Sequence, residues 1–183
     1  TLFTCLLSPI IYLCLFLKKT KIKRILVIQT AKIGDLICST PVFRAIKKRY
    51  PHAHLSVMVN PVTKELLEYN PNVNEIIAIE GNFHRGFLGK IKLARLVYKG
   101  RYTIAISLNP NLPFILAMFW GLIPVRISIM PDYSGITYKM ASQFCTYIEK
   151  HSKGRLVAET YMKMLKAIGI ENNDISKYVF KSP

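Results

Sequence analysis

Short apolar runs alternate along the chain with stretches in which apolar residues recur every three or four positions. The runs are rich in β-branched residues and lack a polar alternation, which is typical of strands buried on both faces of a sheet. The alternation predicts an α/β fold with a mostly parallel sheet covered by helices on both faces. The expected strands are residues 24–29, 55–59, 74–79, 102–108 and 125–130. The expected helices are residues 35–50, 61–70, the second part of 81–101, 113–122 and 155–170.

The predicted helix 35–50 has a two-sided pattern, with an apolar side and a largely basic one. Pro41 is compatible with this helix if it lies near the first turn. Residues 131–152 show no pattern that places an element. The expected inner face of helix 35–50 consists of Ile37, Val42, Phe43, Ile46 and Tyr50.

The first 17 residues carry no charge, and a basic cluster that ends at Arg24 follows them. As a helix they would span roughly 26 Å, slightly less than a hydrocarbon core of about 30 Å. We therefore expect an apolar N-terminal helix, a membrane anchor or interfacial helix over residues 1–20, with its basic flank on the cytoplasmic side. A helix buried against another domain and a processed signal peptide are the alternatives.

The formal net charge of +16 predicts an anionic partner: a membrane surface, a nucleic acid or a phosphorylated substrate. The composition, with 51% hydrophobic residues, is that of a folded domain. The basic residues do not interleave with aromatic residues as in nucleic-acid-binding motifs, so we expect no nucleic acid as partner. The four cysteines form no CxxC or Cys/His pair, which predicts no zinc site and a reducing compartment.

The stretch "TAKIGD" (30–35) directly follows the first predicted strand. Ligands of open parallel sheets bind beyond the carboxyl ends of the strands, and Gly34 would let a ligand approach the backbone there. A single glycine is neither the dinucleotide fingerprint nor a P-loop. Asp35, the only acid before Glu65, is either a helix cap or a working carboxylate. In the second role it would be a weak base, suited to an alcohol that loses its proton as another bond forms.

Residues 81–101 contain six Lys or Arg and no acid. Such a segment is either a solvated face or a surface that binds phosphate. His84 lies within it and is a further candidate for holding an anion.

Residues 24–77 follow a specific order of motifs. A strand leads to "IGD", "TP", an amphipathic helix, "RYP", a second strand and "NPNVNEII". The later "YTIAISLNPN", "RISIM" and "ETYMKMLKAIGI" are weaker matches. On these residues the chain resembles, over about residues 24–180, the N-terminal half of the family 9 glycosyltransferases, the ADP-heptose:lipopolysaccharide heptosyltransferases.

The resemblance implies two Rossmann-like domains of the GT-B type, of which residues 21–180 would be the acceptor-binding one. Asp35 matches the family aspartate that is regarded as the general base. The implied reaction is attack of an acceptor hydroxyl on the anomeric carbon as ADP leaves, with inversion and without metal or cofactor. ADP-heptose would be bound mainly by a C-terminal donor domain that is absent after Pro183, so we expect this chain alone to be inactive.

The implied acceptor is a lipopolysaccharide core or a related anionic glycolipid at the cytoplasmic face of the bacterial inner membrane. Next to Asp35, the expected acceptor contacts are Thr30, Lys32 and Gly34. The candidates for contacts with the anionic groups of the acceptor are Arg85, Lys90 and Lys92.

Two features depart from the family pattern. Thr103 and Ser107 occupy positions of the fourth strand where the family often has an aspartate, and "RIS" at 126–128 replaces the frequent "RIG". These departures leave the expected fold unchanged. The alternative function is a non-catalytic, membrane-anchored module that binds anionic glycolipid.

Overall fold

A six-stranded sheet, in which every neighbouring pair of strands is parallel, forms the centre of the molecule. The computed structural model describes residues 8, 9, 11–13, 15, 21–131, 135–171 and 174–177. The order across the sheet is β3-β2-β1-β4-β5-β6. The strands are β1 (Arg24–Gln29), β2 (His54–Val59), β3 (Glu75–Ala78), β4 (Ile104–Ser107), β5 (Val125–Met130) and β6 (Tyr147–Lys150).

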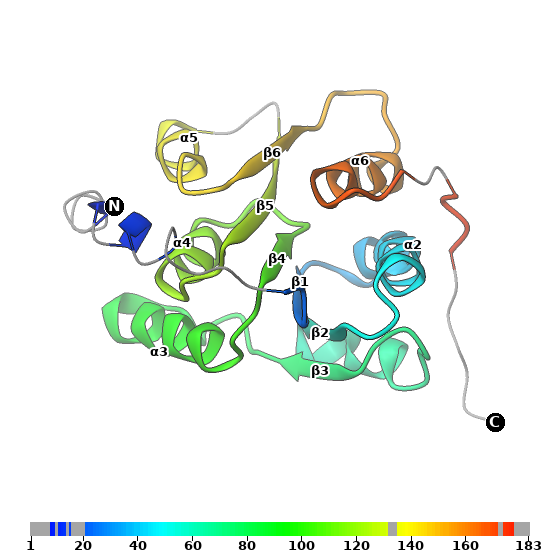
Figure 1. The fold of residues 1–183 in the computed structure, drawn as a ribbon, viewed down its shortest axis with the longest axis horizontal. Coiled ribbons are helices and arrows are strands. Elements are labelled where there is room, and N and C mark those ends of the chain that lie inside the picture. The colour runs from blue at the N-terminus through cyan, green and yellow to red at the C-terminus, as the bar shows by residue number, and fades with distance from the viewer. Residues whose placement is uncertain are drawn as a thin grey trace.

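Helices cover both faces of the sheet, as the sequence predicts (Figure 1). One face carries α2 (Ile33–Arg49), α6 (Val157–Met164) and the 3₁₀ helices η1 (Pro61–Leu67) and η2 (Leu165–Ile168). The other face carries α3 (Gly86–Lys99), α4 (Leu112–Trp120) and α5 (Ile136–Ser142).

The alternation of side chains along β1 shows how one apolar run supplies two cores. Ile25 and Val27 point into the core beneath α2 and α6. Leu26 and Ile28 point the other way, into the core shared with α3 and α4. All four side chains are fully buried. A strand covered on both faces is mainly apolar on both of its sides, which explains the apolar run in the sequence.

Pro41 is the ninth residue of α2 and does not lie near the first turn, where a proline would be expected. A proline there removes the N–H group that would bond the carbonyl of Ile37. The hydroxyl of Thr40 donates to that same carbonyl oxygen at 2.9 Å, so the carbonyl keeps a partner. The neighbouring Ser39 hydroxyl donates to the carbonyl of Leu36 at 2.6 Å. These two hydroxyls explain why a proline is tolerated within the helix.

Two elements, α5 and β6, lie in the segment 131–152, for which the sequence predicts none. The strand β6 has the sequence "YIEK" and lies at the edge of the sheet, where its residues are half-buried or exposed. An edge strand needs no continuous apolar run, so its sequence has no clear strand signal. The helix α5 has only seven residues, too few for a periodic pattern.

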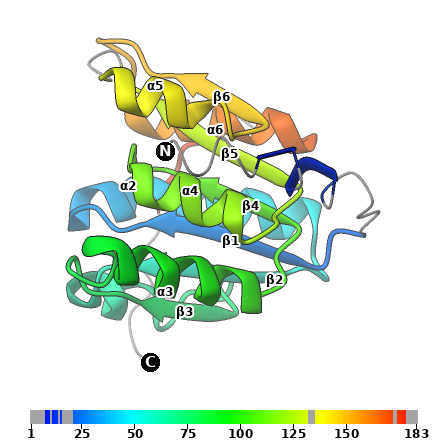
Figure 2. The same ribbon diagram turned by 90° about the vertical axis from the view of Figure 1, so that its left-hand side faces the viewer.

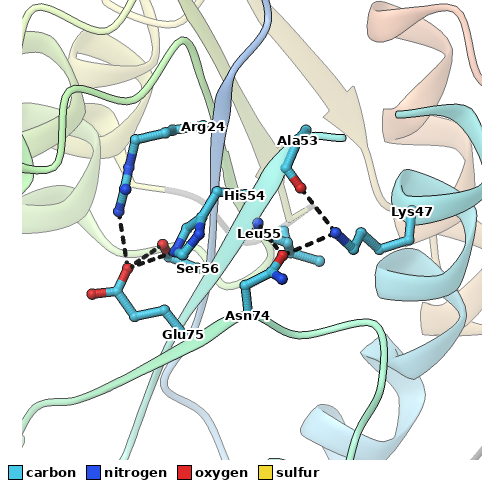
Figure 3. A network of polar contacts seen from close by, with 8 residues as sticks. All are labelled: Arg24, Lys47, Ala53, His54, Leu55, Ser56, Asn74 and Glu75. Atoms are coloured by element: carbon cyan, nitrogen blue, oxygen red, sulfur yellow. Dashed lines mark hydrogen bonds and ion pairs between the residues drawn. The ribbon is translucent and has the colours of Figure 1, made fainter. Parts of the chain in front are cut away.

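The amino edge of the sheet is closed by a polar network around Glu75 (Figure 3). The carboxylate oxygen Oε2 accepts hydrogen bonds from the Ser56 hydroxyl at 2.6 Å and from Arg24 at 3.0 Å. The ring of His54 lies 3.2 Å from the same oxygen. The Ser56 hydrogen bond is the main cause that lowers the pKa of Glu75, with smaller contributions from His54 and Arg24 and an opposing one from burial. The network connects β1, β2 and β3 and assigns His54 a structural role.

We expect Glu75→Gln to lower the free energy of unfolding at neutral pH. In acid the variant and the wild type should become equally stable. A lowered pKa in the folded state stabilises the protein above the unfolded value of 4.5, and this stability is lost as the pH falls through the folded pKa. The difference from wild type at pH 7 should be no more than about 1 kcal/mol, because water screens a partly exposed carboxylate. Urea unfolding at pH 7 and below pH 4 measures it. Ser56→Ala should shift the acid transition to higher pH, whereas a pH-independent difference contradicts the assignment.

The end of α2 is attached to the same edge by Lys47. Its Nζ donates to the carbonyl of Ala53 and to the side-chain oxygen of Asn74, each at 2.9 Å (Figure 3). The Asn74 oxygen also accepts from the backbone N–H of Leu55 at 2.9 Å. Lys47 is therefore engaged in structure, although the sequence places it among the outward basic residues.

The described part of the N-terminal segment packs against α4 and α5. Ile11 is buried in the core of that face. The ring of Tyr12 meets that of Phe119 edge-on at 5.4 Å, and its hydroxyl donates to the carbonyl of Gln143 at 3.4 Å. Among the described residues, no helix has both the length and the apolarity needed to cross a membrane. Most of the expected anchor, residues 1–20, lies outside the described residues, and its role stays a prediction.

Candidate active site

The order of the strands creates a topological switch point at the carboxyl edge of the sheet. From β1 the chain proceeds outward to β2 and β3, and it then returns to the other side of β1 with β4. The connection after β1 leads to α2 on one face, and the connection after β4 leads to α4 on the other (Figure 2). The two connections diverge, and such switch points are where open α/β sheets bind ligands. The segments that follow Gln29 and Ser107 therefore form the candidate site.

A direct hydrogen bond joins these two segments. The side-chain Nδ2 of Asn109 donates to the Thr30 hydroxyl oxygen at 3.2 Å, across 79 residues of sequence. The hydroxyl of Ser107 donates to the backbone carbonyl of Asn109 at 3.0 Å and holds the loop. The side-chain Oδ1 of Asn109 is buried and has no hydrogen-bond partner among the described residues.

Asp35 lies in the first turn of α2, where its half-buried carboxylate is favoured by the positive end of the helix dipole. The helix begins at Ile33, two residues earlier than predicted, and its N-cap is Lys32. The interpretation of Asp35 as the helix cap is therefore wrong. Lys32 has an extended backbone and makes no side-chain capping bond, so the sequence carries no signal for this start. The position leaves the Asp35 carboxylate available for another role.

Gln29, the last residue of β1, holds the backbone around Asp35 by hydrogen bonds. Its side chain is fully buried, and its Nε2 donates to the carbonyl of Asp35 at 3.4 Å and to the Tyr161 hydroxyl oxygen at 3.1 Å. Its Oε1 accepts from the backbone N–H of Ala31 at 3.4 Å. Burial raises the pKa of Tyr161 to about 12, and the nearby charge of Asp35 adds to the rise. Gln29 and Tyr161 thus fix the start of α2 relative to α6.

Gly34 lies at the open end of α2. The residue is exposed, and a Cβ atom built on it would meet no atom within 4 Å. The neighbouring Lys32 is also exposed and carries the nearest positive charge in the sequence to Asp35. The side of the helix start that bears Gly34 is therefore open to solvent, and its contact with an acceptor stays a prediction.

The basic candidates occupy another part of the molecule. Arg85 is the N-cap of α3, and Lys90 and Lys92 lie on the exposed side of that helix. The helix α3 covers the opposite face of the sheet from α2. The structure thus brings Thr30, Lys32 and Gly34 together with Asp35 but leaves the cations of α3 apart from them. Their contact with an acceptor stays a prediction.

His84, a further candidate for anion binding, packs against α4. Its ring centre lies 5.4 Å from that of Phe114, and its Nδ1 is buried without a partner in the described structure. Burial lowers the pKa of His84, and the charges of Arg85 and Lys90 lower it further. A neutral imidazole is a poor binder of anions, so this environment favours a packing role.

Sequence reasoning missed three residues of the site: Gln29, Asn109 and Tyr161. A polar side chain at the end of an otherwise apolar strand is a signal for Gln29, and "LNPN" directly after a strand is one for Asn109. No sequence signal marks Tyr161. Among the described residues, no group of three or more His, Cys, Asp or Glu side chains is placed to hold a metal ion.

Comparison with known proteins agrees with this fold. No family model matches the chain. The lipopolysaccharide heptosyltransferase 3 of Escherichia coli is 22% identical to it over 142 residues, which cover 76% of this chain and 41% of the relative. The solved glycosyl transferase of family 9 from Veillonella parvula DSM 2008 is 27% identical, with a TM-score of 0.68 over 87% of this chain and 45% of its own. The solved ADP-heptose lipopolysaccharide heptosyltransferase II of E. coli is 23% identical, with a TM-score of 0.65 over 87% and 47% of the two chains.

The fold is thus a Rossmann-like domain that matches GT-B glycosyltransferases. The resemblance seen in the sequence is confirmed, because the curated and structural neighbours are heptosyltransferases and family 9 glycosyltransferases that cover much of this chain. The chain spans about two fifths of the length of the curated relatives it matches.

Proposed function

We propose that this chain is the acceptor-binding part of an inverting glycosyltransferase that transfers heptose from ADP-heptose to a lipopolysaccharide core or a related anionic glycolipid. The observation that supports the proposal most directly is the constellation at the switch point between β1 and β4, where Asp35, Thr30 and Asn109 lie. The similarity to heptosyltransferases over three quarters of the chain supports the same class of reaction.

In the proposed reaction, Asp35 accepts the proton of an acceptor hydroxyl. The hydroxyl oxygen forms a bond to the anomeric carbon of heptose as the bond between that carbon and the ADP phosphate oxygen breaks. ADP leaves with the bonding electron pair, and the configuration at the carbon inverts. A carboxylate is a weak base, but it suffices because the hydroxyl becomes acidic only as the new bond forms. The proposed step assigns no role to a metal ion.

The other residues of the site would orient the acceptor. Asn109 would fix the side chain of Thr30, whose hydroxyl oxygen accepts from its Nδ2. Lys32 can meet a carboxylate or phosphate of the acceptor at the same edge. Arg85, Lys90 and Lys92 would meet anions further out, on the side of α3.

We propose the cytoplasmic face of the inner membrane as the location, because the acceptor is a lipid.

Transfer can be tested with the full product of the gene that encodes this chain. The substrates are ADP-heptose and a deacylated, phosphorylated core oligosaccharide, and the readout is ADP release together with the mass of the product. UDP-glucose as donor and an acceptor without phosphate are the controls. Heptose transfer supports the proposal. Binding of the acceptor without any transfer would favour the alternative, a non-catalytic glycolipid-binding module.

We expect Gly34→Ala to weaken acceptor binding about tenfold without destabilising the protein. A Cβ at this position meets no protein atom, so a loss must come from the ligand that the glycine admits. Alanine in place of glycine within a helix stabilises it by roughly 0.5–1 kcal/mol. Calorimetric titration with the core oligosaccharide and thermal unfolding measure the two effects.

Gly169→Ala is the matched control for Gly34→Ala. Gly169 has a left-handed backbone with φ of 71°, so alanine there should cost about 1–2 kcal/mol of stability and leave acceptor binding unchanged. Equal acceptor affinity of wild type and Gly34→Ala would place the acceptor elsewhere.

A further inference from the structure

An apolar groove runs along the outside of the molecule between α3 and α4. Its volume is about 490 Å³. Lys90 and Arg95 contribute to its lining, and the other lining residues are mainly apolar. The groove belongs to the face of the sheet opposite α2 and lies outside the site of Asp35. Its main apolar residues are Phe87, Ile91, Tyr98, Pro113, Leu116 and Trp120.

The helix α3 also exposes large apolar side chains next to this groove. Phe87 and Leu88 are each 72% exposed, and Ile91 and Tyr98 are about half exposed. Single exposed apolar residues are common, but four on one helix beside an apolar groove form a patch, and such patches mark sites of interaction. The buried side of α3, with Leu93 and Val97, already supplies the contact with the core. The four exposed side chains belong to neither core cluster.

Positive charges flank this patch and no negative charge occurs within the segment. Lys90, Lys92, Arg95 and Lys99 all lie on α3, where Lys90, Lys92 and Arg95 are exposed and Lys99 ends the helix. Residues 81–101 contain no Asp or Glu. A helix that combines exposed aromatic and aliphatic residues with flanking cations has the composition of helices that lie in the interface of an anionic membrane.

We propose that α3 and the groove beside α4 form the surface by which the protein docks onto an anionic lipid bilayer. Phe87 and Leu88 enter the acyl boundary, the cations of α3 meet lipid phosphates, and the groove accepts part of an acyl chain over Trp120. Two copies of this chain would bring like charges together on this surface, which disfavours a second copy as the occupant.

The position of the N-terminal segment agrees with this orientation. Its described residues pack on α4 and α5, and therefore lie on the same face of the sheet as α3 (Figure 2). A bilayer on this face would contact both. The inference rests on the proposed function in one respect: a lipid-linked acceptor would place the protein at a bilayer.

The test is binding of the full chain to vesicles of phosphatidylethanolamine and phosphatidylglycerol in a 3:1 ratio, by co-sedimentation. The double variant Phe87→Ser/Leu88→Ser should bind at least tenfold more weakly than wild type, because each side chain loses its apolar contact with lipid. Val62→Ser is the matched control, since Val62 is 77% exposed but lies on η1, on the other face. The N-terminal segment is present in every variant, so the difference isolates α3.

The contribution of charge is tested separately. Arg95→Gln/Lys99→Gln should weaken binding to these vesicles about tenfold or more, and wild type should bind poorly to pure phosphatidylcholine. Lys48→Gln/Lys166→Gln removes the same charge from α2 and η2, on the opposite face, and should have a smaller effect. Equal effects of the two charge variants would mean that net charge alone drives binding and would overturn the proposal.

Trp120 gives a direct readout of the groove, because it is the only tryptophan in the chain. Vesicles with brominated acyl chains should quench its fluorescence in wild type, and much less in Phe87→Ser/Leu88→Ser. Unchanged vesicle binding of that variant, or absence of quenching, would overturn the proposal. Self-association that depends on Phe87 and Leu88, without lipid binding, would assign the surface to a second copy instead. The assay contains no sugar, so its outcome is independent of whether heptose transfer is found.

Discussion

Replacement of Asp35 by asparagine should reduce the rate constant for heptose transfer by at least about 10²-fold, because general bases contribute roughly 10²–10⁴-fold. Asparagine has nearly the same shape but cannot accept the proton of the acceptor hydroxyl. Affinity for the acceptor, measured by calorimetry, should change little, since the other contacts remain. The loss should therefore appear in kcat rather than in KM.

The control for Asp35→Asn is Asp174→Asn. Asp174 is an exposed acid near the C-terminal end of the described chain, and it pairs at 2.7 Å with Arg44 of α2. The control variant should leave kcat within twofold of wild type. Thermal unfolding of Asp35→Asn should show that the free energy of unfolding falls by about 0.3–1 kcal/mol, which is the usual contribution of a carboxylate in the first turn of a helix. Unchanged turnover together with this loss would reduce Asp35 to a stabiliser of α2.

The second large effect is expected at Arg126, where methionine should lower the free energy of unfolding by about 3 kcal/mol. The side chain is 2% exposed, and its guanidinium donates to the carbonyls of Ile123, Pro124 and Phe144. Methionine fills a similar volume but leaves these carbonyls without their donor. Burial also lowers the pKa of Arg126, which shows that the charge is held there at a cost in solvation.

Urea unfolding measures the effect of Arg126→Met, and Lys48→Met on the exposed side of α2 is the control, with a change of less than about 0.5 kcal/mol. If Arg126→Met proved neutral or stabilising, the cost of burying the charge would balance its three hydrogen bonds, as happens in some buried ion pairs. The guanidinium also lies 5.5 Å from the ring of Phe119, so loss of packing adds to the expected destabilisation.

The central strands could be predicted from the sequence because burial on both faces favours runs of mainly apolar residues, with only isolated buried polar side chains such as Gln29 and Arg126. The prediction for 24–29 matches β1, and that for 125–130 matches β5. The edge strand β6 could not be predicted, since a half-exposed strand such as "YIEK" has no such run. The predicted start of α2 is two residues late because its N-cap, Lys32, makes no side-chain capping bond that the sequence could reveal.

Within the site, the local part was predictable and the non-local part was not. Thr30, Gly34 and Asp35 belong to one short stretch after β1, and a strand-to-helix connection at the carboxyl edge is a known place for ligands. The partnership of Thr30 with Asn109 exists only because β4 pairs with β1, which the local pattern does not show. Tyr161 reaches Gln29 from 132 residues away.

The position of β1 between β2 and β4 also bears on how the chain folds. Its pairing with β2 joins residues about thirty apart, but its pairing with β4 must close a loop from Ile25 to Ile104. Closing a loop of this length costs conformational entropy before the contacts between the strands can form. Because pairing between residues distant in sequence slows folding, the β1–β4 ladder should form slowly. During synthesis, β1, β2 and β3 emerge first and leave one edge of β1 open until β4 arrives. An unpaired edge of a mainly apolar strand is a template for aggregation, so the nascent chain is most exposed to misassembly just before β4 completes the switch point beside Asp35.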